Sequence, residues 1–93
     1  GDLGVSVGVD PSRIISELGP HLPYMEGFHR RYMVSNKIMK LWGRMVRQLP
    51  IRMIVPQHGC PLTGRAVADF IDWAEGLQCG VDLMGPENYK LPA

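Results

Sequence analysis

The sequence lacks the features that define several large classes of protein. Only two of its 93 residues are cysteine, too few for the disulfide framework of a small secreted domain. No apolar run approaches the roughly 20 residues that a membrane-spanning helix requires. No basic segment followed by an apolar stretch opens the chain, as a signal peptide would. Internal repeats, low-complexity tracts, a P-loop and a G-x-G-x-x-G motif are also absent.

The charge is balanced overall but uneven along the chain. Ten Lys and Arg against nine Asp and Glu give a formal net charge of +1, which excludes a strongly polycationic or polyanionic protein. A basic stripe is expected on one helix face: Lys37, Lys40, Arg44 and Arg47. Such a stripe is most often a solvated face, and docking of an acidic protein is the alternative. Nucleic-acid binding is not favoured, because no basic–aromatic motif accompanies the stripe.

The middle of the chain has the strongest helical pattern. Residues 24–49 predict two helices, or one helix with a kink at Ser35-Asn36, ending at Leu49-Pro50. The side chains expected to face the core share a 3.6-residue period: Ile38, Leu41, Trp42, Met45, Val46 and Leu49.

Two further helices are predicted on either side of this segment. Asp10-Pro11 favours a helix start and predicts a short helix over 11–18. Thr63 is the expected N-cap of a helix over 64–76. The buried stripe expected for this last helix comprises Val67, Phe70, Ile71, Ala74 and Leu77, with Trp73 at its edge.

Strand signals are few. Residues 51–55 are apolar and partly β-branched, and they predict a buried strand. Residues 3–9 alternate in a strand-like way but contain two glycines, and residues 81–84 could form a short strand. Helices alternating with short strands indicate an α/β architecture. Because one strand cannot form a sheet, we expect either a homodimer or a longer parent protein, and the chain does not begin with Met.

Few residues are candidates for chemistry. His58 directly follows the predicted strand in a Pro/Gly loop, where α/β proteins often place functional groups. A metal ligand, a general base and a purely structural histidine all remain open for it. Asp2 alone carries little information. His29, beside Arg30-Arg31, is expected at the surface, and His21 has no partner at metal-ligand spacing.

Two short motifs resemble the metallo-β-lactamase superfamily. Gly1-Asp2-Leu3-Gly4 resembles its GD element, in which an Asp at a strand end bridges two metal ions. Val55-Pro56-Gln57-His58-Gly59 resembles its last motif, in which a strand delivers a final His ligand. The segment from Tyr24 to Leu49 is similar to the helical insert of the flavodiiron branch, above all to its stand-alone oxygen-binding di-iron proteins. The resemblance covers about residues 1–77.

This resemblance implies a fold and two ligands. Residues 1–93 would be the C-terminal part of one metallo-β-lactamase-like domain, a helix-rich α/β half of an αβ/βα sandwich, with the parent extending upstream. Asp2 would be the bridging carboxylate and His58 the terminal ligand of the second metal. The family's His-x-Glu-x-Asp-His element and its further His are absent here. We therefore expect the isolated chain to bind metal weakly or not at all and to have no catalytic activity. By the same resemblance, residues 3–9 would be a loop.

The resemblance also implies a function for the parent. It would be a cytoplasmic protein that binds O₂, or an oxidoreductase that reduces O₂ or NO, at a non-haem centre of two iron ions. An acidic electron donor such as a rubredoxin could dock on the basic stripe. One alternative keeps the fold but binds zinc and hydrolyses an ester, thioester or phosphodiester. The other is a non-enzymatic helical interaction domain in which Asp2 and His58 are incidental.

Overall fold

The computed structural model describes residues 2–89 and 91. Gly1 of the expected GD element and Lys90, Pro92 and Ala93 of the tail lie outside the described residues. The described residues form three α-helices, α1 (Glu26–Tyr32), α2 (Asn36–Val46) and α3 (Arg65–Gly76), and two short strands, β1 (Met53–Ile54) and β2 (Leu62–Thr63). Three 3₁₀ helices complete the fold: η1 (Gly19–Tyr24), η2 (Gly80–Leu83) and η3 (Pro86–Tyr89). The expected helix-rich α/β fold with few strands is confirmed.

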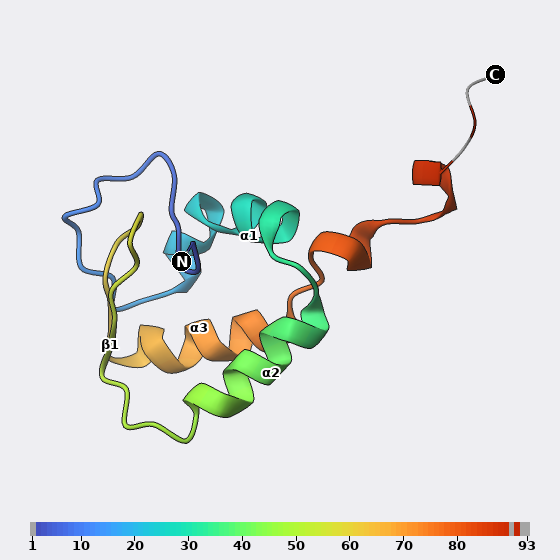
Figure 1. Ribbon diagram of the computed structural model, residues 1–93. Helices are drawn as coiled ribbons and strands as arrows, with labels where there is room; N and C mark the ends of the chain where they lie inside the picture. The colour runs from blue at the N-terminus through green and yellow to red at the C-terminus, as the bar shows by residue number, and fades with distance from the viewer. Residues whose placement is uncertain (1, 90, 92–93) are drawn as a thin grey trace.

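Helix α3 is the centre of the core, and α2 packs along it (Figure 1). Its predicted apolar stripe is fully buried, and Phe70 has no exposed surface. The Phe70 ring meets the rings of Trp42 from α2 and Trp73 at centroid distances of 6.0 and 5.7 Å. Such edge-on and tilted contacts add to the apolar area that these large side chains bury. None of the helices in the described part of the chain is long and apolar enough to cross a membrane.

The predicted break between two helices is confirmed at Met33–Ser35. The Ser35 backbone is extended, and its hydroxyl accepts the amide proton of Ile38 at 3.4 Å. This bond satisfies one of the amides that the first turn of α2 leaves without an intrahelical partner. The chain therefore turns between α1 and α2 rather than continuing as one kinked helix.

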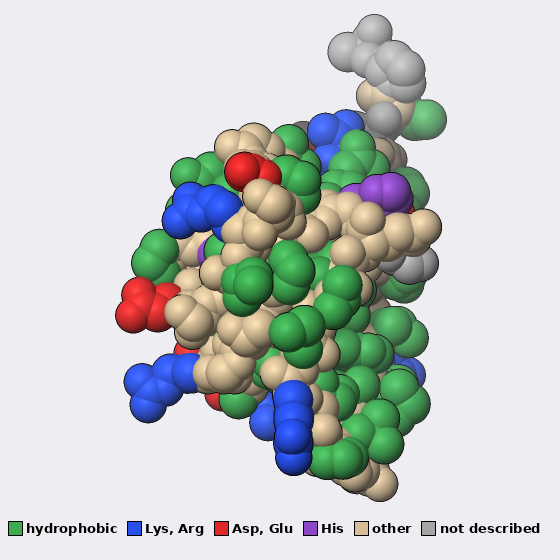
Figure 2. Space-filling model, turned by 90° about the vertical axis from the view of Figure 1, so that its left-hand side faces the viewer, with side chains coloured by type: hydrophobic (Ala, Val, Ile, Leu, Met, Phe, Trp, Pro, Cys, Tyr) green, Lys and Arg blue, Asp and Glu red, His purple; other side chains and the backbone are tan. Residues whose placement is uncertain are grey.

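The face of α2 that lies against α3 matches the predicted one only in part, because Trp42 and Val46 pack in the core as expected but other residues do not. Ile38, Leu41 and Met45 are 48%, 50% and 58% exposed, whereas Met39 and Gly43 are buried. The physical reason is the close approach of α3 at Gly43. A Cβ there would lie 2.5–2.8 Å from the Glu75 side chain, so the small residue decides which side of α2 meets α3. Part of the apolar stripe consequently faces outward. Hydrophobic side chains also gather on the right-hand side of the face shown in Figure 2.

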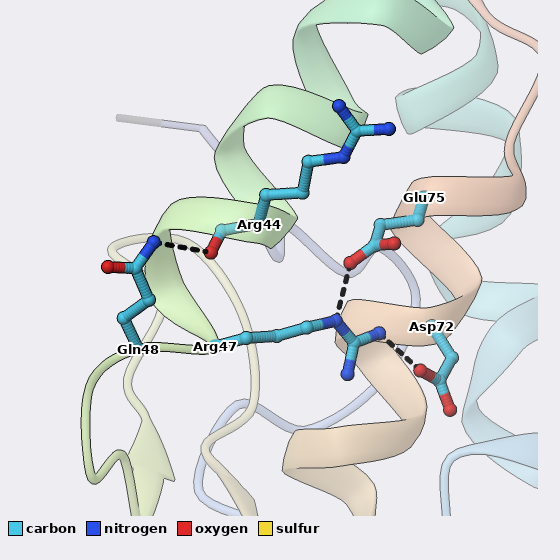
Figure 3. Close-up of polar contacts among 5 residues, drawn as sticks. All are labelled: Arg44, Arg47, Gln48, Asp72 and Glu75. Atoms are coloured by element: carbon cyan, nitrogen blue, oxygen red, sulfur yellow. Dashed lines mark hydrogen bonds and ion pairs between the residues drawn. The ribbon is translucent and has the colours of Figure 1, made fainter.

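Arg47, at the end of α2, joins this helix to α3. Its Nε donates to Glu75 Oε1 at 2.6 Å, and its Nη2 donates to Asp72 Oδ1 (Figure 3). Because the pairs are exposed to water, they add little to the stability of the fold. Their main effect is to fix how the two helices are aligned. The predicted basic stripe is thereby reduced to Lys37, Lys40 and Arg44.

The predicted helix over 11–18 is wrong. Asp10 instead closes a turn, in which its carboxylate accepts from the amide and the hydroxyl of Ser12. Ile15 then pairs with the strand region: its amide donates to Pro61 O at 2.8 Å, and its carbonyl accepts from the Thr63 amide at 2.9 Å. These contacts, 46 to 48 residues away in sequence, require an extended backbone and override the local helix signal.

The strand prediction is only partly correct. β1 lies within the expected 51–55 and pairs antiparallel with β2, Met53 opposite Thr63 and Ile54 opposite Leu62. Met53 and Val55 are exposed, so the strand is not buried as expected. Thr63 belongs to β2 and makes no cap, because Gly64 precedes α3.

Of the two other segments with a weak strand pattern, one has the expected structure and the other does not. Residues 3–9 contain no strand and form the expected loop. Residues 80–83 form η2 rather than a strand, and Figure 1 shows η3 projecting from the body of the molecule. Cys60 and Cys79 are both buried and both free, so they form no bridge.

Asn36 links the start of α2 to the end of α3. Its side-chain amide donates to the carbonyls of Glu75 and Leu77 at 2.9 and 2.7 Å, and its backbone amide donates to Asp82 Oδ2 at 2.5 Å. The two carbonyls belong to the last turn of α3, which has no intrahelical partners for them. The Asn36 side chain therefore caps the end of α3, while its backbone amide, in the first turn of α2, is bonded to Asp82.

We expect Asn36→Ala to lower the free energy of unfolding by about 1–3 kcal/mol, because it leaves buried carbonyls without a donor. Lys37→Ala is the matched control on the neighbouring exposed position and should change stability by less than about 0.5 kcal/mol. Urea unfolding followed by circular dichroism measures both. Equal effects of the two substitutions would contradict the capping role.

Candidate metal site

The loops that carry Asp2 and His58 lie against each other. The Ser6 amide donates to the carbonyl of His58 at 3.2 Å, and the Cys60 amide donates to the Ser6 hydroxyl at 3.3 Å. Ser6 therefore links the loop that begins at Asp2 to the loop that follows β1. The structure brings together the backbones that carry the two residues predicted from the sequence.

Two glycines allow this contact. Gly4 has φ +87°, which favours glycine, and a Cβ on it would lie 2.8 Å from Pro56 Cγ. A Cβ on Gly59 would collide with the carbonyl oxygen of Gly4 and would lie 3.0 Å from the Ser6 amide nitrogen. Any larger side chain at either position would push the loops apart.

Both candidate ligands are accessible at this junction. The side chains of Asp2 and His58 are exposed, so neither is used by the core. A carboxylate can span two cations, and a neutral imidazole suits iron or zinc, so the donor types fit a metal site. Among residues 2–89 and 91, no group of three or more His, Cys, Asp or Glu could hold a metal ion.

The sequence indicated that His29 lies at the surface, but the structure buries it completely, with 0% exposure. Its Nε2 accepts from the Gly4 amide at 2.8 Å, and its Nδ1 lies 2.7 Å from the carbonyl oxygen of Met25. Burial lowers the pKa of His29, and the Met25 hydrogen bond acts weakly in the opposite direction. Sequence reasoning missed this residue because of the neighbouring arginines. Its spacing of four from Met25, on the core side of α1, was the available signal.

His21 is also buried, at 3% exposure, but its hydrogen bond and its ring contact are with residues outside the two loops. Its Nε2 has no hydrogen-bond partner among the described residues. Burial lowers the pKa of His21, and the charge of Arg13 adds to the effect. It lies on η1 beside Tyr24 and makes no hydrogen bond to either loop of the candidate site.

Comparison with known proteins gives a consistent result. Residues 1–59 match the family described as "ODP family beta lactamase". A solved structure described as the peroxy diiron species of the chemotaxis sensor ODP is 43% identical, with a TM-score of 0.84, over 96% of this chain and 38% of that one. The apo state of the chemotaxis sensor ODP from T. denticola is 42% identical, with a TM-score of 0.83, over 96% and 36%. No curated protein matches.

These findings confirm the expected β-lactamase-like superfamily. The chain spans less than two fifths of the length of each of these solved proteins. The chain therefore matches one part of each of those structures.

We expect Gly59→Ala to destabilise the chain by about 1–3 kcal/mol, because the added methyl group overlaps the Gly4 carbonyl. Gly76→Ala is the control: nothing lies within 4 Å of a Cβ at this helical position. The control should be neutral or stabilise by up to about 1 kcal/mol. Thermal and urea unfolding measure the difference, and a neutral Gly59→Ala would show that the loops do not depend on this contact.

Proposed function

Since the chain belongs to the ODP family of β-lactamase-like proteins, we propose that it is part of a non-haem di-iron protein that binds O₂. Asp2 and His58 are two of the metal ligands in this proposal. The remaining ligands would come from the rest of the protein, since this chain spans 38% of the similar diiron protein.

The observation that carries the proposal is the 43% identity, over 96% of this chain, to a protein solved as a diiron species. At that identity the loops of two chains are expected to follow the same path. The junction of the Asp2 and His58 loops is compatible with the proposal, because Gly4 and Gly59 allow the two loops to approach each other closely.

The residues of this chain have distinct roles in the proposal. The exposed Asp2 carboxylate would bridge two cations and balance part of their charge, and an imidazole nitrogen of His58 would bind one of them. Ser6 keeps the two backbones at a fixed separation through its amide and hydroxyl. Two ferrous ions, when bound, supply the electrons for the chemistry of O₂.

Metal analysis of the full-length protein, purified without oxygen, tests this proposal. We expect two irons per polypeptide, and a large loss of bound iron in Asp2→Ala and in His58→Ala, because each removes a direct ligand. Asp10→Ala is the control, since this carboxylate accepts from Ser12 in the same N-terminal segment and has no proposed metal role. Two zincs would favour the hydrolase instead. A metal-free protein would leave the interaction domain as the interpretation.

We also propose that the basic surface of α2 binds an acidic electron donor, which reduction of O₂ or NO would require. Three cations and one carboxylate line one groove beside the exposed side chain of Leu41: Lys37, Lys40, Arg44 and Asp82. The net positive charge of this groove suits weak docking of an acidic protein.

Charge reversal tests the donor surface. Lys40→Glu with Arg44→Glu should slow reduction of the full-length protein by an acidic donor such as a rubredoxin by about tenfold or more at low salt, and the difference should shrink as salt rises. Arg52→Glu with Arg65→Glu, at two exposed arginines outside α2, is the control of equal charge change. A reduction rate that does not depend on salt would contradict the proposal.

A further inference from the structure

The imidazole of His29 is fixed from both sides by hydrogen bonds. Its Nε2 accepts a hydrogen bond from the Gly4 amide, so this nitrogen is unprotonated and the ring proton is on Nδ1. Nδ1 then donates to the Met25 carbonyl at 2.7 Å. The ring is thus neutral and in one tautomer, with one nitrogen facing α1 and the other facing the loop that follows Asp2.

Aromatic side chains hold this ring in place. It lies edge-on to Phe70 and Trp73 of α3, with centroid distances of 6.2 and 5.2 Å. Both partner side chains belong to the central helix of the core. Burial of the ring lowers the pKa of His29, which keeps Nε2 available as an acceptor. The acceptor therefore has a position that the core determines rather than the loop.

The bond acts at the residue where the two loops of the candidate site meet. Gly4 is buried, two residues after Asp2, and packs on Pro56, two residues before His58. Its carbonyl oxygen touches the position of Gly59. The His29 acceptor of this amide consequently determines how close the Asp2 backbone lies to the His58 loop.

We propose that His29 is a positioning residue of the metal site: by accepting the Gly4 amide proton, it holds the Asp2 carboxylate where a cation shared with His58 requires it. Partners of this kind, one step removed from the metal, typically change metal affinity by 10–100-fold when they are lost. The inference rests on the proposed function, because it assigns His29 a role in that same site.

A role in packing alone would be served equally well by an apolar ring. Phenylalanine would keep the contacts with Phe70 and Trp73 and would remove only the two nitrogens. The Met25 carbonyl would retain the backbone amide of His29, which donates to it at 3.2 Å. The buried Gly4 amide would lose its acceptor. The two roles can therefore be separated by substitution.

The experiment uses the full-length protein and three variants. His29→Phe removes the acceptor, His29→Gln restores an oxygen acceptor near the position of Nε2, and His21→Phe replaces another buried histidine whose Nε2 has no partner. The readouts are the iron dissociation constant, the visible spectrum of the iron-loaded protein, and hydrogen exchange of the Gly4 amide in the iron-free protein.

We expect His29→Phe to weaken iron binding by about 10–100-fold and to speed exchange of the Gly4 amide. His29→Gln should recover most of the affinity and the wild-type spectrum, and His21→Phe should bind iron as the wild type does. Equal losses in His29→Phe and His29→Gln, or no loss in either, would overturn the positioning role.

Two results separate this inference from the proposed function. A wild-type protein that binds no iron overturns the proposed function and removes the site that His29 would position. A wild-type protein that binds two irons but leaves the Gly4 amide unprotected overturns the inference alone, and this result requires no variant to fold.

Discussion

The candidate site depends on the contact between Gly4 and the loop that follows β1. Two segments more than 50 residues apart in sequence lie so close that one added methyl group would overlap the other segment. The contact is possible only because neither Gly4 nor Gly59 has a side chain. Ser6 adds hydrogen bonds across it, and His29 supports it from the core. The helices α1 and α3 thus act on the site indirectly, through the position of one buried imidazole.

Helices specified by their own residues were predictable from the sequence. The buried stripe of α3 has a 3.6-residue period and a length of about three turns, and the structure places every residue of it in the core. The break before α2 follows from Ser35, whose hydroxyl competes for a backbone amide. In both cases the information lies within a few residues of the element it determines.

The segments that depend on distant contacts were not predictable. Residues 11–18 have a good helix start, yet Ile15 is held extended by partners near residue 62. The rotation of α2 is decided by Gly43 against Glu75, which periodicity within α2 does not contain. Asp2 and His58 are candidate ligands only through a family resemblance, and the structure places their loops together. His29 was expected at the surface because of the neighbouring arginines, and its hydrogen bond to Gly4, 25 residues away, is visible only in the structure.

The buried thiol of Cys60 gives this junction a chemical reporter. Its Sγ donates to the Asp10 carbonyl at 3.2 Å and receives the Ser6 hydroxyl at 3.8 Å, and it has no exposed surface. A reagent can reach it only after the two loops have separated, because a thiol reacts when it is exposed and ionised. The rate of alkylation at Cys60 therefore measures the local opening equilibrium of the junction, independently of global unfolding. The stability of the loop junction and the protection of the Cys60 thiol from oxidation consequently depend on the same contacts.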